Sequence, residues 1–286
     1  MSDLLPKIRE ICQLFEIKPS RTKGQNFLVN ERIYDDIVNA SDLKKEDTVL
    51  EIGPGLGFLT FKLAQKVKKV LAVELDDQLA NYLQIGIDAQ GIDNVEIFNE
   101  DILRFNLEKN LTRTTNYKIV ANLPYNITSF FLRLFLTAKH KPDSLVLMLQ
   151  KEVAERIVAT PSDMSLLALS VQYYADAKII RTVKAGNFWP EPKVDSAIIR
   201  LDLKQDKKLG TTEQAKEEKL FFRLVKIGFS AKRKMIKNNL AGGLKVDQKI
   251  IANILLKNKF DPLLRAEDLS LEDWLKLFAA LREFMV

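Results

Sequence analysis

The chain has 286 residues, of which 47% are hydrophobic and 29% are charged, with a formal net charge of +6; such a chain can bury one large and one smaller domain, and its basic balance favours a polyanionic partner. A single cysteine and a single histidine exclude a disulfide framework and a Cys/His metal cluster. Because no apolar run approaches the roughly 18 residues of a membrane span and the first residues lack a secretory signal, we expect a cytoplasmic protein that binds neither metal nor membrane.

The first distinctive segment is Gly24-Gln25-Asn26-Phe27-Leu28, which precedes the first predicted strand. It carries neither the alternating pattern of a strand nor the three- and four-residue spacing of a helix. On this local pattern alone, the segment containing Asn26 and Leu28 is predicted to be an ordinary loop.

Between residues 48 and 150, short β-branched apolar runs alternate with segments whose apolar residues recur every three or four positions. The runs predict strands at 48–53, 68–75, 94–99, 117–123 and 144–150. The segments between them predict helices at 58–67, 77–89 and 129–140. Continuous apolar strands separated by helices indicate an α/β fold whose parallel sheet is covered on both faces.

A glycine-rich turn follows the first of these strands. Gly53, Gly55 and Gly57 are spaced G-x-G-x-G, and Glu74 ends the second strand. Glycines allow a ligand to approach the backbone, and a carboxylate at this place can accept hydrogen bonds from both hydroxyls of a ribose. The spacing differs from the G-x-G-x-x-G of pyrophosphate-binding turns, so S-adenosylmethionine fits better than a dinucleotide. Asp101, after the third strand, is placed either to accept from the adenine amine or only to cap the next turn.

The fourth strand ends in Asn122-Leu123-Pro124-Tyr125. The Asn122 side-chain carbonyl and the Leu123 backbone carbonyl can together accept both hydrogens of an exocyclic aromatic amine, while Pro124 fixes the local φ angle and removes a competing donor. Tyr125 offers a flat face on which a base can stack. This tetrapeptide therefore predicts methylation of an amine on an adenine that is held outside its stack.

Two further strands are predicted at 178–186 and 195–203, as antiparallel additions at one edge of the sheet. Phe188 and Trp189 lie between them, and their pattern alone favours core aromatics over a binding role. The polar stretch at 204–218 predicts a surface connection, so we place a domain boundary between residues 205 and 206.

The C-terminal domain is predicted to be all-helical, with helices at 219–242, 247–258 and 270–285. Its start coincides with the densest basic stretch of the chain, which runs from Lys219 to Lys245 without an acidic residue. Such a stretch is either a solvated surface or a set of phosphate contacts that position an RNA. The residues that we expect to share one helical face or the turn beside it are Arg223, Lys226, Arg233, Lys234 and Lys237.

Together these motifs resemble those of the ribosomal RNA adenine dimethyltransferase family, in particular its bacterial small-subunit enzymes. The resemblance spans nearly the whole chain and rests on separated motifs in a fixed order: "GQNFLVN", "VLEIGPGLGFLT", "AVELD", "EDIL", "NLPYNIT", "QKEVAERI" and "FWPEPKVDSAIIRL". It implies a Rossmann-like S-adenosylmethionine methyltransferase domain over residues 1–205 and a smaller helical RNA- or ribosome-binding domain over residues 206–286. One departure is Met164-Ser165-Leu166-Leu167, where many relatives carry Tyr-Gly-Arg-Leu.

The resemblance also implies roles for single residues. The residues that match the family's S-adenosylmethionine site are Asn26, Leu28, Gly53, Gly55, Glu74, Asp101 and Asn122. The residues that match its catalytic tetrapeptide and the aromatic facing the target base are Asn122, Leu123, Pro124, Tyr125 and Phe188. The implied reaction is dimethylation of two adjacent adenosines near the 3′ end of small-subunit (16S) rRNA within an immature ribosomal subunit. We expect the enzyme to act as a monomer.

Three other interpretations stay open. The related enzymes that methylate large-subunit rRNA and confer macrolide resistance share these motifs, although Leu123 and the helical C-terminal segment are more typical of the small-subunit type. A protein that only checks ribosome assembly by binding premature particles would not need an intact tetrapeptide. A dinucleotide-dependent oxidoreductase is disfavoured by the glycine spacing and by the tetrapeptide.

Overall fold

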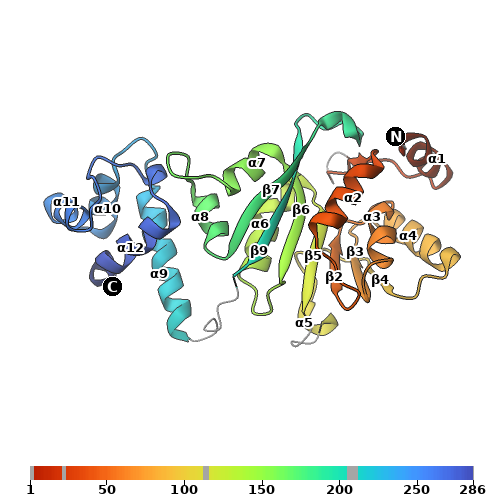
Figure 1. The fold of residues 1–286 in the computed structure, drawn as a ribbon, viewed down its shortest axis with the longest axis horizontal. Helices are drawn as coiled ribbons and strands as arrows, with labels where there is room; N and C mark the ends of the chain where they lie inside the picture. Colours follow the sequence, from red (N-terminus) through yellow and green to blue (C-terminus); the bar gives the residue numbers. More distant parts are fainter. Residues whose placement is uncertain (1–2, 21–23, 112–115, 205–211, 286) are drawn as a thin grey trace. The chain divides into compact units, whose positions relative to one another are not determined.

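The structure, a computed structural model, describes residues 3–20, 24–111, 116–204 and 212–285. Its helices and strands are shown in Figure 1. Within the described ranges, no helix combines the length and the apolar character needed to cross a membrane.

The chain forms two compact units, and each is described by itself. The first comprises Met1–Ala154 and Asp176–Leu203, and the second comprises Glu155–Ala175 and Lys204–Val286. The boundary predicted between residues 205 and 206 lies outside the described residues. Residues 155–175, which the sequence placed in the first domain, belong to the second unit because their apolar side chains pack in its core.

The first unit is built on a seven-stranded sheet with the order β4-β3-β2-β5-β6-β9-β7 (Figure 1). The strands are β2 (Thr48–Ile52), β3 (Lys69–Val73), β4 (Val95–Phe98), β5 (Tyr117–Asn122), β6 (Ser144–Gln150), β7 (Ala175–Val183) and β9 (Ser196–Leu203). The neighbours from β4 to β6 are parallel, and β9 joins β6 in antiparallel register. The predicted α/β fold is confirmed, including the antiparallel strand that follows β6 in the sheet.

One helix directly precedes β2, and the other helices of this sheet connect its parallel strands. They are α2 (Glu31–Ala40), α3 (Phe58–Ala64), α4 (Asp77–Gln90), α5 (Leu107–Asn110), the 3-10 turn η1 (Tyr125–Ile127) and α6 (Thr128–Leu136). All five residues of β2 are buried, as expected at the centre of a covered parallel sheet. One core cluster joins Ile37 of α2, Leu63 of α3 and Leu83 of α4 to Val49 and Val120 of the sheet. This packing holds the carboxyl ends of the central strands in place.

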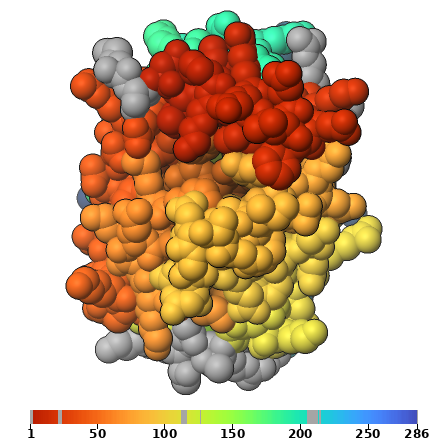
Figure 2. Space-filling view, turned by 90° about the vertical axis from the view of Figure 1, so that its right-hand side faces the viewer, coloured from red at the N-terminus to blue at the C-terminus, as the bar shows by residue number. Residues whose placement is uncertain are grey.

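The elements that the sequence did not predict are mostly short. They are α1 (Leu5–Leu14), β1 (Phe27–Leu28), α2, α5, η1, α7 (Lys151–Ile157), α8 (Leu166–Gln172), η2 (Ala185–Asn187), β8 (Phe188–Trp189) and the 3-10 turn η3 (Ala266–Asp268). Residues of α1 pack in one apolar cluster with Leu56 and Leu79, and Figure 2 shows the N-terminal residues, in red, lying against orange and yellow residues. β1 and β8 pair antiparallel, with Leu28 opposite Phe188. The loop expected at residues 24–28 therefore contains a strand. A strand of two residues is too short to show an alternating pattern in the sequence.

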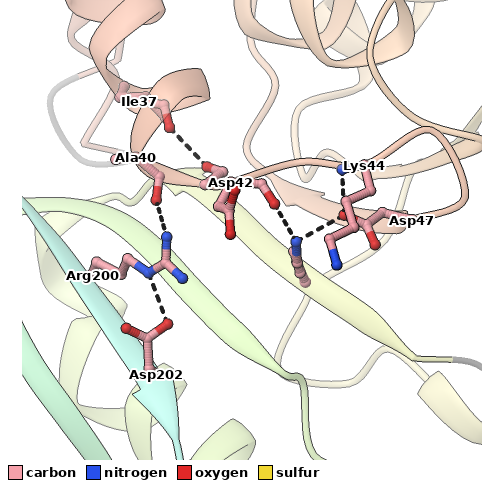
Figure 3. A network of polar contacts seen from close by, with 9 residues as sticks. Ile37, Ala40, Asp42, Lys44, Asp47, Arg200 and Asp202 are labelled. Carbon is pink, nitrogen blue, oxygen red and sulfur yellow. Dashed lines mark hydrogen bonds and ion pairs between the residues drawn. The ribbon is translucent and has the colours of Figure 1, made fainter.

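A polar network anchors the connection from α2 to β2 (Figure 3). Lys118 of β5 donates to the Asp42 carbonyl at 2.5 Å and forms an ion pair with Asp47 at 2.8 Å. Arg200 of β9 donates to the Ala40 carbonyl at 2.8 Å. These bonds satisfy carbonyl groups at the end of α2 and fasten the start of β2 to its neighbours in the sheet.

The second unit is helical, as predicted. Besides α8 it contains α9 (Thr212–Gly228), α10 (Ile236–Leu244), α11 (Gln248–Lys257), η3 (Ala266–Asp268), α12 (Leu271–Leu281) and η4 (Arg282–Met285). The single helix predicted at 219–242 is wrong, because α9 begins inside the predicted connection and a break separates it from α10. Phe221 and Leu224 of α9 pack with Trp274 of α12 in the core of this unit. The helix start predicted at Ser270 is confirmed, since its hydroxyl accepts from the Asp273 N–H at 3.1 Å.

Candidate active site

The order of the strands reverses at the centre of the sheet. β2 pairs with β3 on one side and with β5 on the other, so the connections that leave the carboxyl ends of β2 and β5 diverge. In open α/β sheets a ligand binds in the crevice at this point. The glycine turn follows β2 and the tetrapeptide begins at the end of β5, so both belong to this crevice.

Glu74 fixes the glycine turn to the end of β3. Gly53 and Gly55 adopt φ angles of +64° and +57°, which residues with a side chain rarely adopt. One Glu74 carboxylate oxygen accepts from the Gly55 N–H at 3.0 Å and the other from the Asp76 N–H at 2.9 Å. Burial raises the pKa of Glu74, and these hydrogen bonds oppose the shift. Each oxygen is thus oriented by one bond and can still accept another.

Asp101 lies just beyond the end of β4. Its Oδ1 accepts from the Leu103 N–H at 2.9 Å, so Asp101 caps the following turn, as one of the two interpretations expected. The side chain is half-buried and lines the same cavity as Glu74. A carboxylate that caps a turn with one oxygen keeps further lone pairs for a ligand.

The segment with Asn26 and Leu28 is tied to neighbouring elements. The Gln25 side-chain amide donates to Asp76 Oδ2 at 3.0 Å, close to the end of β3. The Tyr34 hydroxyl of α2 donates to the Leu28 carbonyl at 3.2 Å, and β1 pairs with β8. These bonds hold the N-terminal segment against the turn that carries Glu74.

The tetrapeptide is fixed at both ends. Asn122 pairs with Met148 of β6, and the Leu123 N–H donates to the Met148 carbonyl at 3.2 Å. The Tyr125 hydroxyl forms a hydrogen bond with the Ser196 hydroxyl of β9 at 2.8 Å. The strand ladder therefore positions Asn122 and Leu123, while a side-chain hydrogen bond positions the ring of Tyr125.

Phe188 is a core aromatic and also part of the cavity wall. It is 4% exposed and packs in the core cluster of the first unit. It also lines the cavity, beside the N-terminal segment with which β8 pairs. The two interpretations of this residue are thus compatible.

These elements enclose a cavity of about 220 Å³. It is lined by every residue that the sequence proposed for cofactor binding or chemistry: Asn26, Leu28, Gly53, Gly55, Glu74, Asp101, Asn122, Leu123, Pro124, Tyr125 and Phe188. Five carboxyl groups also line it, those of Glu51, Glu74, Asp76, Glu100 and Asp101. Among the described residues, no lysine, arginine or histidine lines it. The cavity therefore suits a cationic ligand.

Glu51 is the most unusual of these acids. It lies in β2, is 1% exposed, and neither of its carboxyl oxygens has a hydrogen-bond partner within the described part of the chain. Burial raises the pKa of Glu51 to about 8, an effect that the nearby Thr60 hydroxyl opposes and the Glu74 carboxylate reinforces. Thr60 makes no hydrogen bond of ordinary geometry with it. Glu51 is therefore mostly protonated at pH 7.

Sequence reasoning missed four residues that shape this site. Gln25 and Ser196 stand inside quoted motifs, but their partners are distant in the chain and no spacing pointed to them. Tyr34 lies on a helix that was not predicted. Glu51 did carry a signal, because an acid inside a continuous apolar strand must be buried with that strand.

The residues proposed to contact RNA all lie in the second unit. Arg223 and Lys226 are on α9, Arg233 and Lys234 are in the connection to α10, and Lys237 is on α10. The first four are exposed and Lys237 is half-buried. They are thus divided between a helix, the turn beside it and the next helix.

Comparisons with known proteins agree on one family. A family model described as ribosomal RNA adenine dimethylase matches residues 18–283. The ribosomal RNA small subunit methyltransferase A of Dehalococcoides mccartyi strain CBDB1 is 42% identical over 274 residues, which cover 96% of this chain and 92% of that protein. The dimethyladenosine transferase of Plasmodium falciparum aligns with a TM-score of 0.77 and 27% identity, covering 91% of this chain and 98% of that one. The 23S rRNA methyltransferase ErmE aligns with a TM-score of 0.73 and 26% identity, covering 90% and 100%. The chain therefore belongs to the ribosomal RNA adenine dimethylase family.

Proposed function

We propose that this chain uses S-adenosylmethionine to dimethylate the exocyclic amines of two adjacent adenosines near the 3′ end of small-subunit (16S) rRNA. Support comes from its family and from the Dehalococcoides relative, which is named a small-subunit rRNA methyltransferase. The observation that carries the proposal is one cavity lined by both the Asn122 tetrapeptide and the Glu74 carboxylate.

The charge of the cavity favours S-adenosylmethionine over a dinucleotide. This cofactor carries a sulfonium besides an ammonium and a carboxylate and is therefore a net cation, whereas the pyrophosphate of a dinucleotide would face five carboxyl groups without a basic side chain among the described lining residues. In this proposal Glu74 accepts from the ribose hydroxyls and Asp101 accepts from the adenine amine, and Asn26 and Leu28 line the same cavity. When bound, S-adenosylmethionine supplies an electrophilic methyl group on sulfur.

Asn122 and Leu123 activate the target amine. An adenine amine is a poor nucleophile because its lone pair delocalises into the ring. Hydrogen bonds from its two N–H groups to the Asn122 side chain and the Leu123 carbonyl shift electron density onto nitrogen and stabilise its developing positive charge. Tyr125 and Phe188 hold the flipped base by its two faces.

No side chain has to act as a base before the attack. The transfer is a direct displacement, so the amine nitrogen must lie in line with the methyl carbon and the departing sulfur. The methylated ammonium is acidic enough to lose its proton to water afterwards. The residues of the tetrapeptide therefore contribute by positioning and by accepting hydrogen bonds.

The rRNA needs contacts beyond the cavity. We assign phosphate contacts to the basic side chains of the second unit, Arg223, Lys226, Arg233, Lys234 and Lys237, since such contacts position RNA without reading its sequence. The substrate would be rRNA in an immature small subunit, and the chain would act on it as a monomer. Its cytoplasmic location would follow from that substrate.

The macrolide-resistance type of enzyme is the weaker candidate. The similarity to ErmE, at 26% identity, is lower than the 42% identity to the small-subunit enzyme of Dehalococcoides. A purely binding role in ribosome assembly leaves the complete tetrapeptide and its cavity without a use. A checkpoint role can coexist with methyl transfer.

The proposed function is tested with methyl-labelled S-adenosylmethionine and separated immature ribosomal subunits, followed by mapping of the modified nucleotides. We expect label on two adjacent adenosines of the small-subunit rRNA, present as dimethyladenosine. Label confined to large-subunit RNA would establish the resistance-type reaction instead. The absence of label from both RNAs would leave binding alone as the function.

A further inference from the structure

The ring of Tyr125 is tethered to a serine outside the cavity. The Tyr125 and Ser196 hydroxyls are 2.8 Å apart, and either can donate. Ser196 is 0% exposed and is not among the residues that line the cavity. It is the first residue of β9, paired with Gln150 at the end of β6, so its backbone is held by the sheet. The Ser196 hydroxyl is thus held in place by the sheet, and it can fix the Tyr125 side chain, whose backbone belongs to the 3-10 turn η1.

The residue before Ser196 anchors the segment that leads to Phe188. The Asp195 carboxylate accepts from the Ala185 N–H at 3.0 Å and from the Lys184 ammonium at 2.8 Å. The Asp195 carbonyl accepts from the Lys151 N–H at 2.9 Å, which fastens this corner to the end of β6. Ala185 begins the turn that leads directly into Phe188. The start of β9 therefore holds both segments that carry the proposed base-facing aromatics.

We propose that Ser196 is a positioning residue for the target base, because its hydroxyl fixes the ring of Tyr125 opposite Phe188. This inference rests on the proposed function and adds to it a residue that contacts neither cofactor nor RNA. Without the tether, the Tyr125 ring can turn about its side-chain bonds, and fewer conformations leave the space between the aromatics open for an adenine. The tether acts on capture of the base and leaves the cofactor site intact.

A double-mutant cycle tests this role in methyl transfer to immature small subunits. We expect Ser196→Ala and Tyr125→Phe each to lower kcat/KM for RNA about three- to tenfold, the range for one lost hydrogen bond, with unchanged affinity for S-adenosylmethionine. Because both changes remove the same bond, the double variant should be no worse than either single variant. Losses that multiply in the double variant, or a wild-type rate in Ser196→Ala, would overturn the assignment.

Ser144→Ala is the matched control. Ser144 is also a buried serine at a strand end, but it pairs with Asp202 at the opposite end of the β6–β9 ladder. We expect this variant to keep its kcat/KM for RNA. An equal loss in Ser144→Ala would show that any buried hydroxyl of these strands matters, which contradicts a specific role for Ser196.

A second measurement does not depend on activity. The chain contains six tyrosines, so labelling with 3-fluorotyrosine gives a small set of fluorine resonances in which Tyr125 is identified by its loss in Tyr125→Phe. We expect Ser196→Ala to shift and broaden that resonance alone. An unchanged resonance would refute the tether even if the enzyme methylates adenine. A shifted resonance in a protein that transfers no methyl group would uphold the tether and reject the proposed function.

Discussion

The cavity of the first unit and the basic stretch of the second unit carry opposite charges. Five carboxyl groups line the cavity without a basic side chain among the described residues. The stretch from Lys219 to Lys245 contains no acidic residue. The net charge of +6 is a sum over the whole chain and therefore does not reveal the local charge of either region. The first suits a small cation and the second suits a polyanion, so one chain can bind a cationic cofactor and an RNA in separate places.

The charges of the two regions also differ in how strongly dissolved salt can screen them. Glu51 and Glu74 are buried, so salt reaches them poorly and protonation governs their charge. Arg223, Lys226 and Arg233 are exposed, so dissolved ions would compete with the phosphate contacts proposed for them. Changes of pH should therefore act mainly through the cavity, and changes of salt should act mainly through the basic stretch.

The largest effect should come from a change that leaves both charged regions intact. Asn122→Ala removes one acceptor for the target amine without altering any charge. We expect the single-turnover rate of methyl transfer to fall about 100- to 1000-fold, and the affinity for S-adenosylmethionine, measured by calorimetry, to fall far less. Asn258→Ala, an exposed asparagine of the second unit, serves as control. A wild-type rate in Asn122→Ala would remove this residue from the chemistry.

Neutralising one acid of the cavity should have the next largest effect. Glu74→Gln replaces a carboxylate that accepts from Gly55 and Asp76, so its new amide group opposes one of these N–H donors. We expect the dissociation constant for S-adenosylmethionine to rise about 10- to 100-fold in isothermal titration. Glu96→Gln, on the neighbouring strand β4, removes only an exposed ion pair with Lys69 and should bind normally. Equal affinities for both variants would contradict the site.

The buried acid of β2 makes stability depend on pH. Burial raises the pKa of Glu51 from 4.5 to about 8; the Thr60 hydroxyl of α3 opposes this shift, and Glu74, which directly follows β3, adds to it. The Tyr34 phenol of α2 stays protonated. The folded state thus holds a proton that the unfolded chain releases near pH 4.5. The contribution of Glu51 to the free energy of unfolding should therefore decrease as pH rises from 4.5 to 8, by on the order of 3 kcal/mol between pH 4.5 and 7.

Denaturant unfolding of Glu51→Gln checks this dependence. The variant should lose the decline in stability over that range, whereas Glu96→Gln should keep it. A cation in the cavity favours the ionised form, so the affinity for S-adenosylmethionine relative to neutral S-adenosylhomocysteine should increase as pH rises toward 8. If the free energy of unfolding changed with pH in the same way in the wild type and in Glu51→Gln, the Glu51 carboxyl would not titrate as described.

The smallest single effects should come from the basic stretch. Replacing Arg233 or Lys234 with Gln should weaken RNA binding a few-fold at moderate salt, since each side chain contributes one of several phosphate contacts. The slope of log K against log salt should become shallower by about 0.7 to 0.9 for each contact removed. Lys249→Gln, which lies outside the stretch on α11, should leave the slope unchanged. An unaltered slope in the Arg233 and Lys234 variants would exclude these residues from the RNA surface.

Local patterns were sufficient for the centre of the fold. The strands from β2 to β6 could be predicted because each is a short, mostly apolar run rich in β-branched residues, and the glycine turn and the tetrapeptide follow the ends of β2 and β5. Topology then explains why Gly53 and Asn122 meet, since parallel strands bring their carboxyl ends to one edge of the sheet. Most of the proposed site is therefore a consequence of strand order.

Tertiary pairing decided the rest. β1 and β8 have two residues each, and only their pairing with one another makes them strands. The hydrogen bond between Tyr125 and Ser196 joins residues 71 positions apart, which no spacing rule predicts. Likewise, α9 extends into a polar segment because its later turns pack in the helical core of the second unit.

The most direct test of the central claim is a crystal structure of the protein soaked with S-adenosylmethionine. We expect the ribose hydroxyls on the Glu74 carboxylate, the adenine beside Asp101, and the methyl carbon facing the turn formed by Asn122 and Tyr125. A cofactor bound elsewhere, or one whose methyl carbon points away from that turn, would contradict the account.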